Sequence, residues 1–91
     1  MFQNTNICII LCFNAEKTIE SFLKRIFKIK FENKIDFLVL DDCSIDNTKN
    51  IVKNYISTNN LSNLKYEGNT KNLGFGGNLK KAYDLAIKGK Y

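Results

Sequence analysis

The sequence predicts a three-layer α/β protein, in which helices cover both faces of a parallel sheet. Two observations support this class. Short runs of β-branched and aliphatic residues alternate with segments whose apolar residues recur at helical spacing, and such an alternation favours parallel strands joined by right-handed crossovers. The chain has 91 residues, enough for one small core, so we assign residues 1–91 to a single domain.

The first half of the chain is predicted to form two strands and a helix. A continuous apolar run is typical of a strand buried on both faces, and we expect that strand at Ile7–Cys12. From Ala15 the apolar spacing becomes helical and predicts a helix of about four turns. A second strand is expected at Phe37–Leu40, and it ends at two adjacent acids, Asp41 and Asp42.

The second half repeats the pattern. Residues 44–48 resemble a helix start with a serine or aspartate as the cap, and polar residues 57–60 end that helix. A weaker third strand is expected at Leu64–Tyr66. The glycine-rich segment 68–77 is predicted to be a polar loop. A third amphipathic helix should begin near Leu79, with Gly89 as its stop.

The composition excludes several classes of function. There is no histidine, which rules out a histidine base, a Ser-His triad and a histidine-rich metal site. The cysteines are odd in number and have no disulfide framework, so we expect a reducing, cytoplasmic location. The net charge of +5 indicates either a solvated lysine-rich surface or attraction to phosphates, on a nucleotide or at the inner membrane face. No basic stripe alternates with exposed rings, so nucleic-acid binding is not expected.

Polar segments follow the predicted strands at their carboxyl ends, where open parallel sheets bind ligands. Asp41 and Asp42 end the second strand, and a carboxylate there can accept a hydrogen bond from a base or a ribose. The alternative is a helix-capping acid beside a solvated neighbour. Because successive strand residues point to opposite faces, we expect only one of the two to face the pocket.

The segment 72–78 carries three glycines directly before a helix. Glycine lets backbone N–H groups approach a phosphate, the helix N-terminus adds partial positive charge, and neighbouring lysines at 71, 80 and 81 would add more. The alternative is a flexible loop with turn chemistry. The segment is neither a Walker A loop nor the dinucleotide fingerprint, which would follow the first strand.

Together these segments resemble the family-2 inverting glycosyltransferases, which have the Rossmann-like GT-A fold. Such enzymes open with an apolar strand and a Pro-x-Tyr-Asn turn, continue with a strand ending in Asp-Asp-x-Ser-x-Asp-x-Thr, and reach an Asn-x-Gly segment before a helix. The matching segments here are Ile9–Ile19, Leu38–Thr48 and Asn72–Asn78. The middle one is the most specific, since all five of its named polar positions match.

The resemblance implies a nucleoside-diphosphate sugar as the donor. Asp42, with Asp41 as the alternative, would contact the base or ribose, and Phe13 stands in place of the common tyrosine. Leu11 stands where the family has proline, and the acid that often follows the turn asparagine is displaced by one position to Glu16. The expected binding residues are Leu11, Phe13, Asn14, Glu16, Asp41, Asp42, Ser44, Asn72 and Gly74.

The resemblance also implies a later Asp-x-Asp that holds Mg²⁺ or Mn²⁺ against the donor diphosphate. This sequence contains no Asp-x-Asp, so we name no metal ligand and no catalytic residue. We expect the chain to be the amino-terminal, donor-binding portion of a truncated GT-A domain, inactive alone. The full-length context would be a hexosyltransferase of cell-surface polysaccharide or glycolipid synthesis, peripheral to the membrane. An incomplete sheet edge would favour self-association.

The alternative is a non-catalytic nucleotide-binding or regulatory α/β module. A receiver-like domain also has an acidic pair at a strand end, but receivers place that pair after the first strand, and here it follows the second. A different Rossmann-like enzyme would need a glycine-rich turn after the first strand, where this chain has Asn14-Ala15-Glu16.

Overall fold

The computed structural model describes residues 6–88 of the chain. The elements in order are β1 (Ile7–Cys12), α1 (Ile19–Ile26), β2 (Asp36–Asp41), α2 (Thr48–Thr58), β3 (Leu64–Gly68) and α3 (Gly74–Ile87). The strands form one sheet in the order β1-β2-β3, and both pairings are parallel. The predicted class and the three predicted strands are therefore confirmed.

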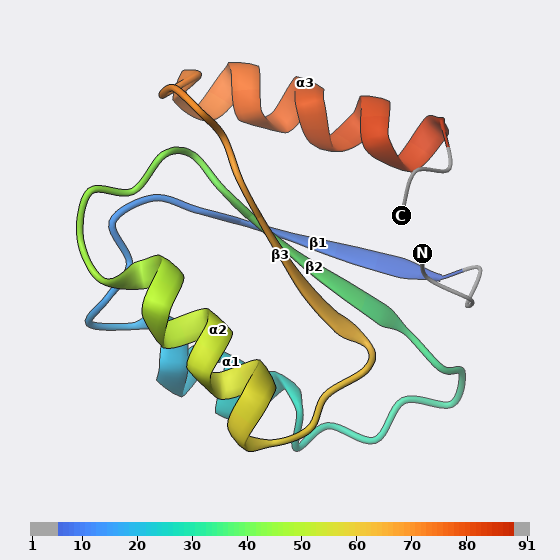
Figure 1. The fold of residues 1–91 in the computed structure, drawn as a ribbon. Coiled ribbons are helices and arrows are strands. Elements are labelled where there is room, and N and C mark those ends of the chain that lie inside the picture. The colour runs from blue at the N-terminus through green and yellow to red at the C-terminus, as the bar shows by residue number, and fades with distance from the viewer. Residues whose placement is uncertain (1–5, 89–91) are drawn as a thin grey trace.

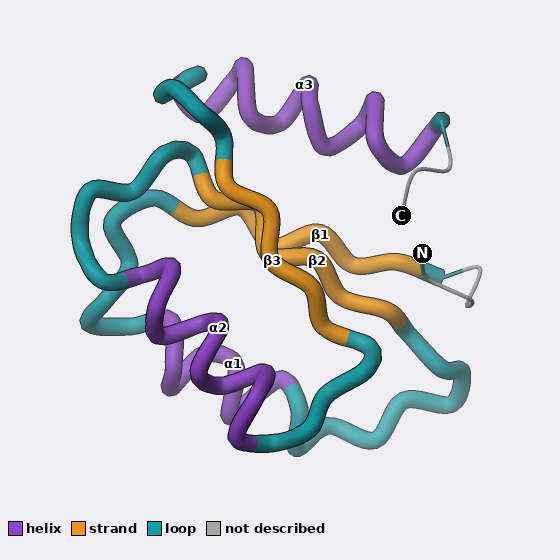
Figure 2. Tube along the Cα trace, viewed as in Figure 1, coloured by secondary structure: helices purple, strands orange, loops and turns teal. Residues whose placement is uncertain are grey.

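The helices cover the sheet from two sides. In Figure 1, α1 and α2 lie together on one face and α3 lies alone on the other. The first two connections advance across the sheet in the same direction, so right-handed crossovers place both helices on the same side. The tube view in Figure 2 shows the chain passing from β3 to the opposite face, where α3 contacts β1. In residues 6–88, β1 pairs only with β2, so its outer edge is open.

The main core lies between the sheet and the α1–α2 layer. It consists of Ile19, Leu23, Phe37, Val39, Val52 and Leu64. Every residue of the central strand β2 is buried. Since side chains alternate along a strand, Phe37 and Val39 face the α1–α2 layer while Leu38 and Leu40 face α3. The same alternation turns the two acids at the end of β2 to opposite faces.

Two predictions about the first half of the chain were wrong in part. β1 has the predicted bounds but is half-buried along its length, because no strand in the described region covers its outer edge. The first helix was predicted from Ala15, but α1 begins at Ile19 and spans 8 residues. The backbone N–H groups of residues 14–16 are bonded to side chains of residues 44–48, in the loop after β2 and at the first position of α2. These bonds hold that segment in a turn. At the other end, Lys28 N–H bonds to Arg25 O, a three-residue spacing that closes the helix.

The start of α2 differs in part from the predicted capping, because the residue at the cap position is Asn47 and its side chain makes no capping bond. The helix begins at Thr48, and Oδ1 of Asp46 accepts the Thr48 N–H at 3.0 Å. The aspartate, rather than the serine at position 44, therefore supplies the acceptor for the first turn.

The third helix begins earlier than predicted. α3 starts at Gly74 rather than near Leu79, so the glycines at 74, 76 and 77 lie in its first turn, while Gly68 ends β3. Its start is fixed by two side-chain acceptors, because Asp42 bonds the Leu73 N–H at 2.7 Å and Asn72 bonds the Gly74 N–H at 2.9 Å. The predicted stop at residue 89 lies outside the described residues. None of the helices within residues 6–88 has the length and apolar character needed to cross a bilayer.

Candidate functional site

A cleft of about 340 Å³ opens where the carboxyl ends of β1 and β2 meet the start of α3. Its lining residues are Leu11, Cys12, Phe13, Asp42, Asn72, Gly74, Phe75 and Asn78. The cleft lies where the chain first passes to the other face of the sheet, which is the place where open α/β sheets bind ligands. Five of the nine predicted binding residues line it, namely Leu11, Phe13, Asp42, Asn72 and Gly74.

Asp42 is the acidic residue of this cleft, and its side chain is firmly held. Oδ1 accepts the Leu73 N–H at 2.7 Å and Nδ2 of Asn69 at 3.0 Å. Burial by itself would raise the pKa of Asp42, but these hydrogen bonds and the charge of Lys81 outweigh burial and hold the pKa below the ordinary 3.8. The side chain is therefore an anion at neutral pH. Both of these bonds end on Oδ1, the N–H of Gly74 also favours the anion, and Asp42 is 4% exposed where it lines the cleft.

Asp41 faces the opposite side of the sheet and does not line the cleft. Its carboxylate is 1% exposed. Oδ1 accepts both the N–H and the hydroxyl of Ser44, and Oδ2 accepts the hydroxyl of Tyr66 at 2.5 Å. These three donors occupy both oxygens, so the geometry favours a structural role for Asp41 and leaves Asp42 as the candidate ligand contact. The expectation that only one of the two faces the pocket agrees with this arrangement.

The polar residues of the loop after β2 hold the turn after β1. Oγ of Ser44 accepts the Asn14 N–H at 2.7 Å, and the Thr48 hydroxyl accepts the N–H of residue 15 at 2.8 Å. Oδ2 of Asp46 accepts the Glu16 N–H at 3.2 Å. In the other direction, Oδ1 of Asn14 accepts the N–H of residue 45 at 3.0 Å. The predicted binding residues Asn14, Glu16 and Ser44 therefore take part in the hydrogen bonds between these two loops, and they do not line the cleft.

The glycines at the start of α3 have different local environments. Gly74 has a φ of +76°, a conformation that side chains rarely adopt, and it borders the cleft. A side chain at Gly77 would approach the Cβ of Leu73 to 3.0 Å. The first N–H groups of a helix have no partner within the helix. The start of α3 therefore offers partial positive charge beside the carboxylate of Asp42.

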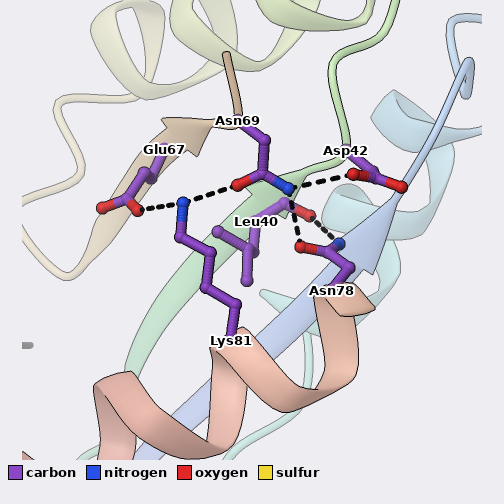
Figure 3. Close-up of polar contacts among 6 residues, drawn as sticks. All are labelled: Leu40, Asp42, Glu67, Asn69, Asn78 and Lys81. Carbon is purple, nitrogen blue, oxygen red and sulfur yellow. Dashed lines mark hydrogen bonds and ion pairs between the residues drawn. The ribbon is translucent and has the colours of Figure 1, made fainter. Parts of the chain in front are cut away.

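Four side chains outside the nine predicted binding residues complete the surroundings of Asp42 (Figure 3). Asn69, after β3, donates to Asp42 and to Oδ1 of Asn78, the latter at 2.9 Å. Asn78, on α3, donates to the backbone oxygen of Leu40 at 3.3 Å. Lys81 donates to Oδ1 of Asn69 at 2.6 Å and pairs with Glu67 at 3.1 Å. Of the lysines expected to attract phosphate, Lys81 is thus engaged inside the fold.

The sequence offered a signal for Asn78, and it named Lys81 only as one of three lysines that could attract phosphate. Asn78 ends the glycine-rich motif, where an asparagine is part of the family pattern. Asn69 lies in no motif, and Lys81 looks like any surface lysine of an amphipathic helix. Their proximity depends on the return of α3 over the sheet.

The described residues do not fit a divalent metal. In residues 6–88 there is no group of three or more histidine, cysteine or acidic side chains able to hold one. Asp41 and Asp42 are adjacent in sequence but lie on opposite faces, so they do not form a joint ligand pair. We therefore derive no step that passes through a metal ion held by these residues.

Comparison with known proteins assigns the chain to a family. The family model described as Glycosyl transferase family 2 matches residues 7–91. The chain belongs to this family. Members of family 2 generally bind nucleotide-sugar donors and use a divalent metal. Glycosyl transfer is the chemistry after which this family is named.

A solved structure supports the same assignment. The crystal structure of S. aureus TarS superposes with a TM-score of 0.68 at 34% identity, over 92% of this chain. The match confirms the GT-A-like fold predicted from the sequence. The chain spans only 14% of the TarS chain. No curated protein matches the chain significantly.

Proposed function

We propose that this chain is the donor-nucleotide-binding portion of a glycosyltransferase that moves a sugar from a nucleoside-diphosphate sugar to an acceptor. The observation that carries the proposal is the ionised carboxylate of Asp42 in the cleft, beside the N-terminus of α3. Oδ2 of Asp42 would accept a hydrogen bond from the base or ribose. The diphosphate would lie against the first-turn N–H groups near Gly74, and Phe13, which is 50% exposed, would pack on the nucleoside.

The experiment is an affinity comparison between two neutralised carboxylates. A charge-assisted hydrogen bond contributes roughly 1.5–3 kcal/mol, so Asp42→Asn should weaken binding of UDP, GDP or dTDP about tenfold or more. Asp84→Asn is the matched control, because Asp84 is exposed on α3 and is not among the residues that line the cleft. Equal affinity in the two variants would refute the assignment of Asp42. We expect millimolar affinities for the parent, since these residues offer no site for a metal.

A nucleotide-binding module without catalysis is the second candidate. It is favoured by the lack of any three-ligand metal group among residues 6–88. Such a module would bind the nucleotide at the same cleft but would not transfer the sugar. An activity assay distinguishes the two candidates.

We also propose self-association through the open edge of β1. The strand carries no charged residue and no proline, the features that natural edge strands use to prevent pairing. Beside it, α3 exposes apolar side chains at a spacing of four residues, namely Phe75, Leu79, Tyr83 and Ile87. Two copies related by a two-fold axis would pair their β1 edges and bring their α3 helices together. Sedimentation should show a dimer that Tyr83→Lys weakens; a monomer at all concentrations would contradict this.

A further inference from the structure

A buried group of polar side chains connects α3 to Asp42 (Figure 3). Asn69 and Asn78 are 8% and 2% exposed, and Lys81, one turn after Asn78 on α3, donates to Asn69. Burying polar groups is costly unless their hydrogen bonds are made. Apolar contacts alone would suffice to hold α3 on the sheet. The presence of a buried polar network therefore indicates that these side chains have a further role.

The chemistry of the donors fixes the direction of this network. A lysine ammonium can only donate, and a carboxylate can only accept. Lys81 donates to Oδ1 of Asn69 at 2.6 Å, so the amide oxygen of Asn69 points to Lys81 and its Nδ2 points to Asp42. The reverse orientation would set the amide oxygen against the carboxylate and the NH₂ group against the ammonium. Glu67 holds Lys81 in turn, at 3.1 Å.

We propose that Lys81 is a positioning residue for the nucleotide site, which fixes the amide of Asn69 and thereby presents Oδ2 of Asp42 to the cleft. Nδ2 of Asn69 bonds Oδ1 of Asp42 together with the Leu73 N–H, and these two donors on one oxygen set the rotation of the carboxylate. Lys81 does not touch the ligand in this arrangement. The inference rests on the proposed function only in naming the ligand as a nucleoside diphosphate.

The test compares two adjacent lysines. Lys81→Met removes the donor and the charge but keeps an apolar stem, and Lys80→Met is the control because Lys80 is exposed. We expect Lys81→Met to raise the carboxyl pKa of Asp42, measured by carbon NMR titration, and to weaken UDP, GDP or dTDP binding about three- to tenfold, the effect of one hydrogen bond. Lys80→Met should change neither quantity. Lys81→Arg, which keeps the charge and the donors, should restore both.

The outcomes separate this inference from the proposed function. If the parent binds none of the nucleotides but Lys81→Met both raises the pKa of Asp42 and shifts the side-chain NH₂ signals of Asn69, the positioning role stands and the proposed function fails. If the parent binds and Lys81→Met leaves both the affinity and that pKa unchanged, the positioning role is wrong.

A measurement on the parent protein covers the case in which Lys81→Met does not fold. The side-chain NH₂ signals of Asn69 should shift with the protonation of Asp42, because Nδ2 donates directly to that carboxylate. Signals that stay constant through the titration would overturn the inference.

Discussion

Tyr66→Phe tests whether the two adjacent acids have different roles. The substitution removes only the hydroxyl that donates to Oδ2 of Asp41 at 2.5 Å. Asp41 is 1% exposed, so water has little access to replace the lost donor. A hydrogen bond to a charged group contributes about 1.5–3 kcal/mol. We expect a loss of about 2 kcal/mol in unfolding free energy, and a fall in melting temperature of about 8–16 °C for a domain of this size.

Circular dichroism during urea and thermal unfolding measures this loss. Tyr83→Phe is the matched control, because Tyr83 is 63% exposed and should change stability little. Nucleotide affinity of folded Tyr66→Phe should stay within about twofold of the parent, since neither Tyr66 nor Asp41 lines the cleft. A stability within about 0.5 kcal/mol of the parent would refute the structural role of Asp41, as would a tenfold loss of affinity.

Three further predictions follow from the same geometry. The chain alone should transfer no sugar when incubated with nucleotide sugars and Mn²⁺, and turnover above background would contradict this. Burial first, and then the charges of Asp41 and Asp46, raise the pKa of Cys12 to about 12; alkylation at neutral pH should therefore be slow when folded and fast in urea, as read by mass spectrometry. The lowered pKa of Asp42 stabilises the fold above the ordinary value of 3.8, and this contribution is lost as pH falls through the lowered value. Asp42→Asn should flatten that part of the acid unfolding curve, and an unchanged curve would exclude the effect.

The sequence was sufficient to predict the order and direction of the elements. Apolar runs separated by amphipathic segments predicted the three parallel strands, because the β-α alternation allows few other topologies. The boundaries of α1 and α3 could not be predicted, since both depend on side chains distant in sequence. The loop after β2 holds the segment before Ile19 in a turn, and Asp42 anchors the start of α3 at Gly74.

The sequence predicted where the site lies, but not which of its residues contact the cleft and which hold the loops in place. Alternation along β2 predicted that only one acid faces the pocket, but not that three donors occupy Asp41. The family motif grouped Asn14 and Ser44 with the binding residues, whereas their hydrogen bonds join two loops. The contribution of Lys81 requires knowing that α3 returns over the sheet, where its side chain reaches Glu67 and Asn69. The amphipathic pattern of one helix does not contain that information.

The location of nucleotide-induced shifts is the most direct test of the central claim, which is that Asp42 and the start of α3 form a nucleotide site. Amide signals of the ¹⁵N-labelled chain would be followed during titration with UDP, GDP and dTDP. The account predicts that the shifts concentrate around Phe13, Asp42 and residues 72–77 for at least one nucleotide, and that they disappear in Asp42→Asn but persist in Asp84→Asn. Shifts confined to the hollow between α1 and α2, around Tyr55 and Asn59, or shifts unchanged in Asp42→Asn, would contradict it.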